Sequence, residues 1–102
     1  MIIVQASMKL RAGKRDAAVA AFTAAMAGAA TEKGCLEYRF TADLIDPALI
    51  HVIEFWEDEA SLLAHFQGKP FKAFIAVAGD IVEPGSMSSL QGDLAPYAFP
   101  LG

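Results

Sequence analysis

The stretch that decides the fold runs from Gly34 to Phe74 and reads GCLEYRFTADLIDPALIHVIEFWEDEASLLAHFQGKPFKAF. Its first half is rich in β-branched and aromatic residues, which predicts two strands, Cys35–Ala42 and Leu49–Glu57. The Asp46-Pro47 dipeptide between them is a reversal signal, so we expect the two strands to pair antiparallel.

Two short helices are predicted after the second strand. The first should span residues 58–66, because it opens with an aspartate that suits the N-cap position and is followed by Gly68. The second should span residues 70–78, because it opens with a proline and is followed by Gly79. We therefore expect the second helical element of the chain to be broken in two.

The flanking segments complete one α+β domain over residues 1–102. Residues 2–10 alternate in polarity like a strand, and residues 14–33 repeat apolar side chains every three to four positions like a helix. We expect a last strand at residues 86–94 and a tail at 96–102. The order βαββαβ predicts a ferredoxin-like fold, an antiparallel four-stranded sheet with the helices on one face.

The other face of such a sheet would be left bare. Apolar residues make up 55% of the chain, which is more than a small monomer can hide in one core. Phe55, Val52 and the first strand are expected on or close to this face. We therefore predict a homodimer in which the two sheets pack face to face through one two-fold interface.

Composition also narrows the classes of partner. The net charge is −4 and the basic residues are scattered, so nucleic acid is not an expected partner. Cys35 is the single cysteine, which fits a reducing compartment. The first ten residues do not resemble a signal peptide, and no apolar run has the roughly 20 residues that span a bilayer. We expect a cytoplasmic protein without a membrane partner.

Several residues of the opening stretch match a known family. They are Gly34 with Tyr38, Pro47, Glu54 with Trp56, Ala64-His65 and Pro70-Phe71. With these residues the chain resembles the antibiotic biosynthesis monooxygenase (ABM) family of small dimeric proteins. The resemblance implies a dimeric α+β barrel and a cofactor-independent monooxygenase. Such an enzyme uses O2 to oxidise a phenolic, quinol or polyketide-like aromatic substrate.

His65 is the first candidate catalytic residue, because imidazole transfers protons at neutral pH. It lies three positions after Leu62, on or beside the buried face of the predicted helix. One interpretation is a core histidine bonded to a backbone carbonyl. The resemblance implies the other, a histidine that borders a cavity between sheet and helices and acts as a base.

Trp56 and Tyr38 are candidate catalytic residues with a positioning role. The indole of Trp56 would give an aromatic ligand an apolar wall and one N–H donor, and the Tyr38 phenol could donate to a substrate carbonyl. Both side chains could equally serve the core. Glu54 is a carboxylate in an apolar strand and needs a partner. A pair with Arg39 or Tyr38 is preferred for it over a role as catalytic base.

The candidate substrate-binding residues form a larger set. It comprises Glu54, the phenylalanines Phe66, Phe71 and Phe74, and the polar side chains Gln5 and Ser7 of the first strand. We expect a pocket in which His65 is joined by Trp56, Tyr38 and Phe74. The resemblance places an amide near Ser7 in related enzymes, so a serine there departs from the family pattern.

Other chemistries find less support in the sequence. The chain has two histidines and one cysteine, without the spaced motifs of zinc, dinucleotide or P-loop sites. No cofactor is therefore expected. Haem degradation on this fold would need an axial histidine where this chain has Ile75, and a tryptophan where it has His65. A third possibility is a non-catalytic dimeric protein that binds a small molecule or serves a stress response.

Overall fold

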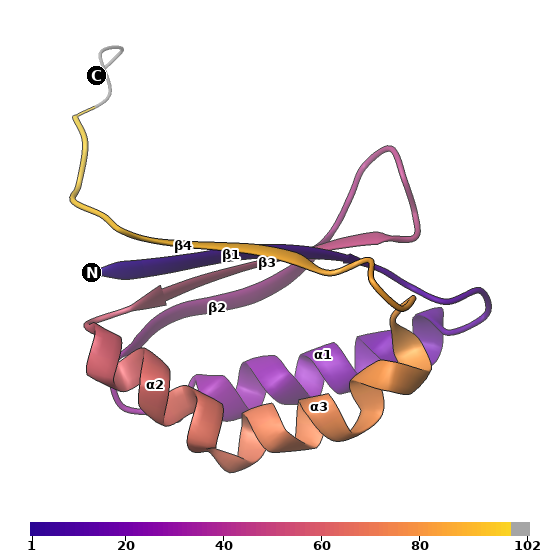
Figure 1. Cartoon of the computed structure of the whole chain (residues 1–102), viewed down its shortest axis with the longest axis horizontal. Helices are drawn as coiled ribbons and strands as arrows, with labels where there is room; N and C mark the ends of the chain where they lie inside the picture. The colour runs from indigo at the N-terminus through magenta and orange to yellow at the C-terminus, as the bar shows by residue number, and fades with distance from the viewer. Residues whose placement is uncertain (99–102) are drawn as a thin grey trace.

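The computed structural model describes residues 1–98, and in these residues three helices cover one face of a four-stranded sheet (Figure 1). The elements are β1 (Ile2–Lys9), α1 (Arg15–Ala29), β2 (Cys35–Ala42), β3 (Leu49–Trp56), α2 (Glu59–Gln67), α3 (Lys69–Ile81) and β4 (Ser88–Asp93). This is the predicted ferredoxin-like order, with the second helical element broken at Gly68.

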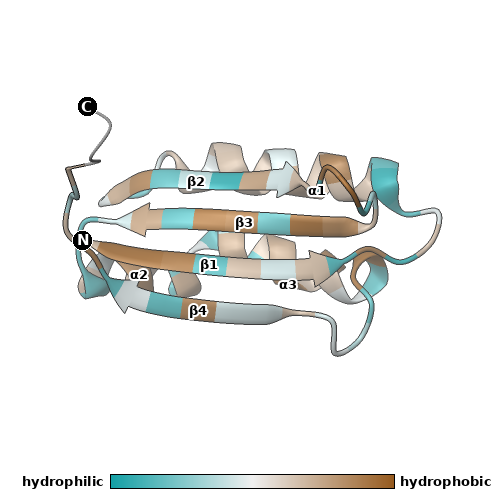
Figure 2. Cartoon of the chain, turned by 90° about the horizontal axis from the view of Figure 1, so that it is seen from above, coloured by the Kyte–Doolittle hydropathy of each residue, from teal (hydrophilic) through white to brown (hydrophobic). Residues whose placement is uncertain are grey.

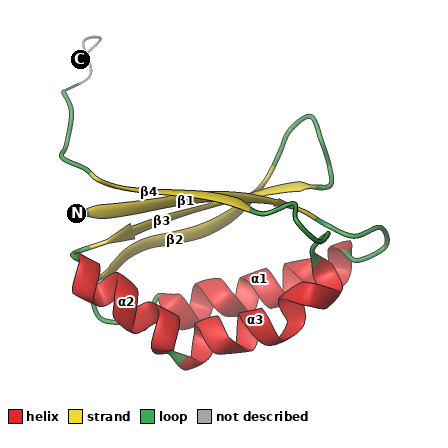
Figure 3. Ribbon diagram, viewed as in Figure 1, coloured by secondary structure: helices red, strands yellow, loops and turns green. Residues whose placement is uncertain are grey.

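The sheet has the order β2-β3-β1-β4, and every neighbouring pair is antiparallel. The helices α1 and α3 pack together beneath it, and α2 lies under the end of β3 (Figure 3). The opposite side of the sheet, here called the open face, is not covered by any part of residues 1–98, and Figure 2 looks down on it. The helix layer is therefore where a buried site can form within one chain.

The core lies between the sheet and the helices. Along β3 every second residue is buried, from Ile50 to Trp56, as a period of two requires. The Phe22 ring stacks on Phe40 at 4.3 Å between ring centroids and tilts against Phe74 at 5.8 Å. Full burial of one such side chain contributes about 1.5–3 kcal/mol, so these contacts hold α1 and α3 to the sheet.

A β-bulge near the start of β2 sets which side chains face the helices. Cys35 pairs with Trp56, but Glu37 pairs with Phe55, the residue adjacent to Trp56 in β3. Leu36 is the extra residue and is 57% exposed. Beyond the bulge Tyr38 falls on the helix side, close to Trp56.

Some element boundaries differ from the predictions. The first helix ends at Ala29 instead of residue 33, and the chain then turns to reach Gly34, whose φ of +81° suits glycine. The third helix does not stop at Gly79 but runs to Ile81, because Ile81 still belongs to its buried stripe. The last strand is shorter than expected, and the end of the predicted tail, residues 99–102, lies outside the described residues.

The open face is mixed in character. The strand registers place these side chains on it: Ile3, Gln5 and Ser7 of β1, His51, Ile53 and Phe55 of β3, and Leu90 of β4. Phe55 is here as predicted, but Val52 is not, because it is 4% exposed in the core on the helix side. The homodimer expected to cover this face stays a prediction.

Candidate active site

His65 lies in the helix α2 and points toward the sheet. The Asp58 side chain caps this helix by accepting from the Ser61 backbone N–H at 2.8 Å. Of the helix residues, Leu62 and His65 are the buried pair, three positions apart on one face. The His65 side chain is only 2% exposed. A histidine so deeply buried needs partners for its ring nitrogens.

Four aromatic rings surround the imidazole, and we call them the aromatic cage: Trp56, Tyr38, Phe71 and Phe66. Their centroids lie 4.7, 5.2, 5.4 and 5.7 Å from that of His65, respectively. The tryptophan closes the inner side and is 0% exposed, whereas Phe66 is 38% exposed and lies toward solvent. The cage is therefore closed on its inner side, and its outer wall consists of the phenylalanines of α2 and α3.

Two carboxylates supply the polar contacts of the cage. The Glu32 Oε1 atom lies 2.7 Å from Nδ1 of His65, and Trp56 Nε1 donates to Glu54 Oε1 at 3.0 Å. The second imidazole nitrogen, Nε2 of His65, is buried and has no hydrogen-bond partner among residues 1–98. An unpartnered buried nitrogen is costly in a merely structural histidine and is typical of a group that meets a ligand.

Burial controls the ionisation of two of these groups. It raises the pKa of the Glu54 carboxyl above its ordinary value, while the Trp56 hydrogen bond and the His65 charge act in the opposite direction. Burial also raises the pKa of the Tyr38 phenol, and the charges of Glu54 and Glu32 raise it further. Tyr38 is therefore a hydrogen-bond donor at neutral pH and not a base.

The structure brings most of the predicted site residues together. Trp56, Tyr38, Phe66 and Phe71 contact His65, and Glu54 binds Trp56. The preferred partners for Glu54, Arg39 or Tyr38, were wrong, because Arg39 instead pairs with Glu37 at 2.8 Å. The backbone carbonyl that one of the two interpretations gave His65 as a partner was also wrong, because Nδ1 meets a carboxylate.

Three predicted residues lie elsewhere. Phe74 packs on Phe22 and Phe40 in the neighbouring core instead of on the imidazole. Gln5 and Ser7 lie on the open face, where they line a shallow pocket of about 230 Å³ with His51 and Leu90. They cannot reach His65, because alternate residues of a strand point to opposite faces of the sheet.

Sequence reasoning missed Glu32. It follows the end of α1 in the turn that leads to β2, 33 positions before the histidine that it binds. In the sequence it is one charged residue in Thr31-Glu32-Lys33, at the end of the predicted helix, where a solvated side chain is the ordinary interpretation. The only available signal was the need of a buried histidine for an acceptor.

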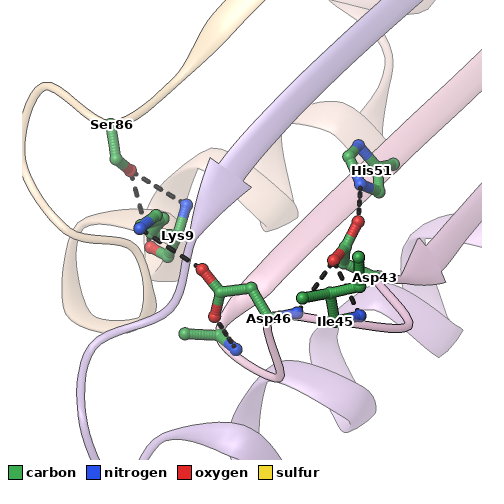
Figure 4. A network of polar contacts seen from close by, with 7 residues as sticks. Lys9, Asp43, Ile45, Asp46, His51 and Ser86 are labelled. Atoms are coloured by element: carbon green, nitrogen blue, oxygen red, sulfur yellow. Dashed lines mark hydrogen bonds and ion pairs between the residues drawn. The ribbon is translucent and has the colours of Figure 1, made fainter.

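A second histidine contact lies on the open face (Figure 4). His51 Nε2 lies 3.0 Å from Asp43 Oδ1, and the Asp43 carboxylate also accepts from the backbone N–H groups of Ile45 and Asp46. The Asp46 backbone N–H, then His51, lower the pKa of Asp43 to about 2. This network fixes the turn between β2 and β3, and Lys9 extends it by pairing with Asp46.

Residues 1–98 contain neither a cluster of metal ligands nor a membrane-spanning helix. That part of the chain has no group of three or more His, Cys, Asp or Glu side chains placed to hold a metal ion. Nor does it contain a helix of the length and apolarity that a bilayer crossing requires.

Comparison with known proteins places this chain in a family. The sequence model of the antibiotic biosynthesis monooxygenase family matches residues 1–77. Among solved structures, a Pseudomonas aeruginosa protein is 26% identical, with a TM-score of 0.81 over 92% of this chain and 94% of that one. A crystal structure named antibiotic biosynthesis monooxygenase is 22% identical, with a TM-score of 0.84 over 94% and 100% of the two chains.

A Deinococcus radiodurans protein has the same fold at 16% identity, with a TM-score of 0.84 and full coverage of both chains. No curated protein matches the sequence. The family match extends over three quarters of the chain and includes β1, β2, β3, α2 and the cage around His65. The chain belongs to the antibiotic biosynthesis monooxygenase family.

Proposed function

We propose that the protein is a cofactor-independent monooxygenase that uses O2 to oxidise a phenolic, quinol or polyketide-like aromatic substrate. The observation that carries the proposal is the unpartnered Nε2 of His65 inside the aromatic cage. Family membership supports the class of reaction. The cage supports the class of substrate, because aromatic walls with one free base suit a flat, acidic phenol.

The proposed reaction begins with transfer of the phenol proton to Nε2 of His65. The resulting phenolate gives one electron to O2, and the radical pair forms a carbon–oxygen bond. The proton returns from His65 to the peroxide, and loss of water leaves a carbonyl. One oxygen atom of O2 thus ends in the product and the other in water. The protein contributes the base, a dry cage and orientation from Trp56 and Tyr38.

The closed cage must open to admit a substrate. His65 is 2% exposed and Trp56 is 0% exposed, so the inner wall offers no entrance. Phe66 and Phe71 come from α2 and α3 on either side of Gly68, and their rings lie 5.1 Å apart in edge contact. We propose that these two side chains move aside, because both are partly exposed and lie on short helices, whereas Tyr38, which is also partly exposed, lies in a strand of the sheet.

Closure of the cage also favours a second candidate, a non-catalytic dimeric protein that binds a small molecule. In that case His65 would serve the ligand as a hydrogen-bond partner and nothing would be oxidised. Haem chemistry has less support, because Ile75, where an axial histidine would be needed, is 52% exposed on α3. Titration with haemin, followed by absorbance, separates that possibility from the other two.

The proposed assembly is a homodimer formed through the open face, and the proposed location is the cytoplasm. Ile3, Ile53 and Phe55 give this face apolar side chains on β1 and β3, its two central strands. Figure 2 shows that both strands contain hydrophobic stretches, drawn in brown. A second copy would bury more than about 1,000 Å² there. Sedimentation that gives a 10.8 kDa species at micromolar concentration would exclude the dimer.

Oxygen uptake with a panel of quinols and polycyclic phenols tests the catalytic proposal. The wild type should consume O2 and place one labelled atom from 18O2 in the product. His65→Ala should lower the rate by about 10² or more, whereas His51→Ala, a matched loss of an imidazole on the open face, should not. A His65 variant with an unchanged rate per folded molecule would remove His65 from the mechanism. Absence of uptake with the whole panel favours the binding protein.

A further inference from the structure

The contact between Glu32 and His65 joins two segments that are far apart in the chain. The Glu32 backbone is fixed on both sides, because its N–H donates to the Ala29 carbonyl at 2.9 Å and its carbonyl accepts from the Cys35 N–H at 3.3 Å. Its side chain is 18% exposed and reaches Nδ1 of His65 at 2.7 Å. The carboxylate is therefore held against the imidazole from a rigid turn.

This contact fixes which imidazole nitrogen carries the proton. An ionised carboxylate only accepts hydrogen bonds, so Nδ1 must be the donor in the contact with Glu32. In neutral imidazole the lone pair then lies on Nε2, the atom that is buried without a partner. The opposite tautomer would place the Nδ1 lone pair against a carboxylate oxygen and would leave the buried Nε2–H without an acceptor. Each of these two effects would lower the stability of the fold.

Space for the Glu32 carboxylate comes from Gly68, the residue between α2 and α3. A Cβ atom at this position would lie 2.6 Å from Glu32 Oε2, well inside a normal contact distance. The Gly68 φ of −81° is open to any residue, so room for the carboxylate explains the glycine and backbone conformation does not. A small side chain here would push Glu32 away from His65.

Other titratable groups near the imidazole do not replace Glu32. They are Tyr38 and Cys35 of β2 and Glu54 of β3, since α2 and α3 bring only phenylalanines to the cage. Glu54 is engaged by Trp56, and the described contacts give no hydrogen bond from Tyr38 or Cys35 to the ring. Among residues 1–98, Glu32 is the only hydrogen-bond partner of the His65 imidazole.

We propose that Glu32 is the positioning residue of His65: it holds the proton on Nδ1, directs the Nε2 lone pair into the aromatic cage, and stabilises the imidazolium formed when Nε2 accepts a proton. Gly68 preserves the space that this requires. The catalytic consequence rests on the proposed monooxygenase function, but the tautomer does not. The arrangement uses a carboxylate as hydrolase triads do, to orient an imidazole without touching the substrate.

Nitrogen-15 NMR of the imidazoles tests the positioning without any substrate. The protein has two histidines, so a His51→Ala spectrum assigns the His65 signals. In the wild type Nδ1 of His65 should be protonated at every pH at which the protein is folded. Glu32→Ala should lose this preference, whereas Glu57→Ala, which removes an exposed charge nearby, should keep it. A wild type with the proton only on Nε2, or no change in Glu32→Ala, would overturn the proposal.

Substitutions at two glycines test the same positioning independently, because both variants retain the Glu32 carboxylate. Gly68→Ala should disturb the His65 nitrogen shifts in the same direction as Glu32→Ala. Gly79→Ala is the matched control, because a Cβ added there meets nothing within 4 Å. Equal spectra for the two glycine variants would show that Gly68 does not serve Glu32.

Kinetics then connect the positioning to the reaction. With a substrate found in the quinol panel, Glu32→Ala should lower kcat about 10- to 100-fold and leave KM nearly unchanged. The acid limb of its rate–pH profile should move to lower pH, because the imidazolium has lost a negative neighbour, and Glu32→Asp should restore part of the rate. A uniform loss with an unmoved profile would overturn the catalytic part. If the wild type oxidises nothing, the function fails while the NMR result still decides the positioning.

Discussion

A single methyl group at Gly28 should weaken the junction that holds α3 against α1. A Cβ at this position would lie 2.7 Å from both Cβ and Cγ of Pro70, at the start of α3. Carbon atoms pack best at about 3.5–4.0 Å, so the overlap is roughly 1 Å, and a proline ring cannot rotate away. Overpacking of this kind typically costs about 1–3 kcal/mol.

The same substitution also brings a gain, since alanine is favoured over glycine in a helix by about 0.8–1.0 kcal/mol. Gly28→Ala should therefore lower the free energy of unfolding by about 0–2 kcal/mol. Gly79→Ala, near the C-terminal end of α3 where the added Cβ meets nothing within 4 Å, should raise it by up to about 1 kcal/mol. The difference between the variants, about 1–3 kcal/mol, is the cost of the clash alone, and it corresponds to roughly 4–24 °C in Tm.

Thermal unfolding followed by circular dichroism at one fixed protein concentration measures this difference, because an assembly would make Tm depend on concentration. Pro70 immediately precedes Phe71 of the aromatic cage, so Gly28→Ala should also change the environment of His65. The reasoning would be refuted if Gly28→Ala melted at or above the temperature of Gly79→Ala, since the helices would then part at no cost.

Three further outcomes are expected. Cys35→Ser should leave the sedimentation behaviour and any oxygen uptake unchanged, and loss of activity in a folded variant would reveal a thiol function. Burial raises the pKa of Glu54, so its contribution to stability is full below the ordinary carboxyl pKa and is lost as pH rises through the folded-state value. Glu54→Gln keeps an acceptor for Trp56 and should raise Tm at neutral pH. A lower Tm there would mean that nearby charge outweighs burial. The pKa of Asp43 is lowered to about 2, so its contribution is present above the ordinary value of 3.8 and is lost as pH falls toward 2. Asp43→Asn should flatten this acid limb of a Tm–pH curve, and an unchanged limb would show that the contacts of the Asp43 carboxylate with Asp46 and His51 do not stabilise the fold.

The fold could be predicted because its elements are each locally consistent. The stretch from Gly34 to Phe74 contains two strands, a turn and a capped helix whose patterns agree with the structure to within a residue or two. Outside this stretch the helix ends differ more: α1 ends at Ala29 instead of residue 33, and α3 continues to Ile81 although Gly79 was expected to stop it. Burial of Ile81 outweighs the modest helix penalty of one glycine, so packing decided this boundary.

The candidate site was predictable only where sequence neighbours become spatial neighbours. Trp56 and His65 lie at the end of β3 and in the helix that follows directly, so the turn between them brings both into one cage. Gln5 and Ser7 were assigned to the cavity although Ala6 and Met8 face the helices. The alternation of side chains along β1 shows that these two pairs of residues lie on opposite faces of the sheet. It does not show which face the helices will cover.

Glu32 could not be found from pattern at all. Its partner lies 33 positions away, and only the three-dimensional path of the turn after α1 brings the two side chains together. The β-bulge of β2 could not be predicted either, because the extra residue, Leu36, does not interrupt the apolar pattern of the strand. Long-range polar contacts and single-residue irregularities are properties of the assembled fold.

The chain has only one tryptophan, and that residue is Trp56, whose ring centroid lies 4.7 Å from His65. All indole fluorescence of the protein therefore arises inside the cage. A protonated imidazole quenches an adjacent indole more strongly than a neutral one, so the emission intensity should follow the charge of His65 as pH changes. An aromatic ligand that enters the cage should alter the same emission. The fold thus places an intrinsic fluorescent reporter at the candidate active site, and its signal can be measured on the unmodified chain.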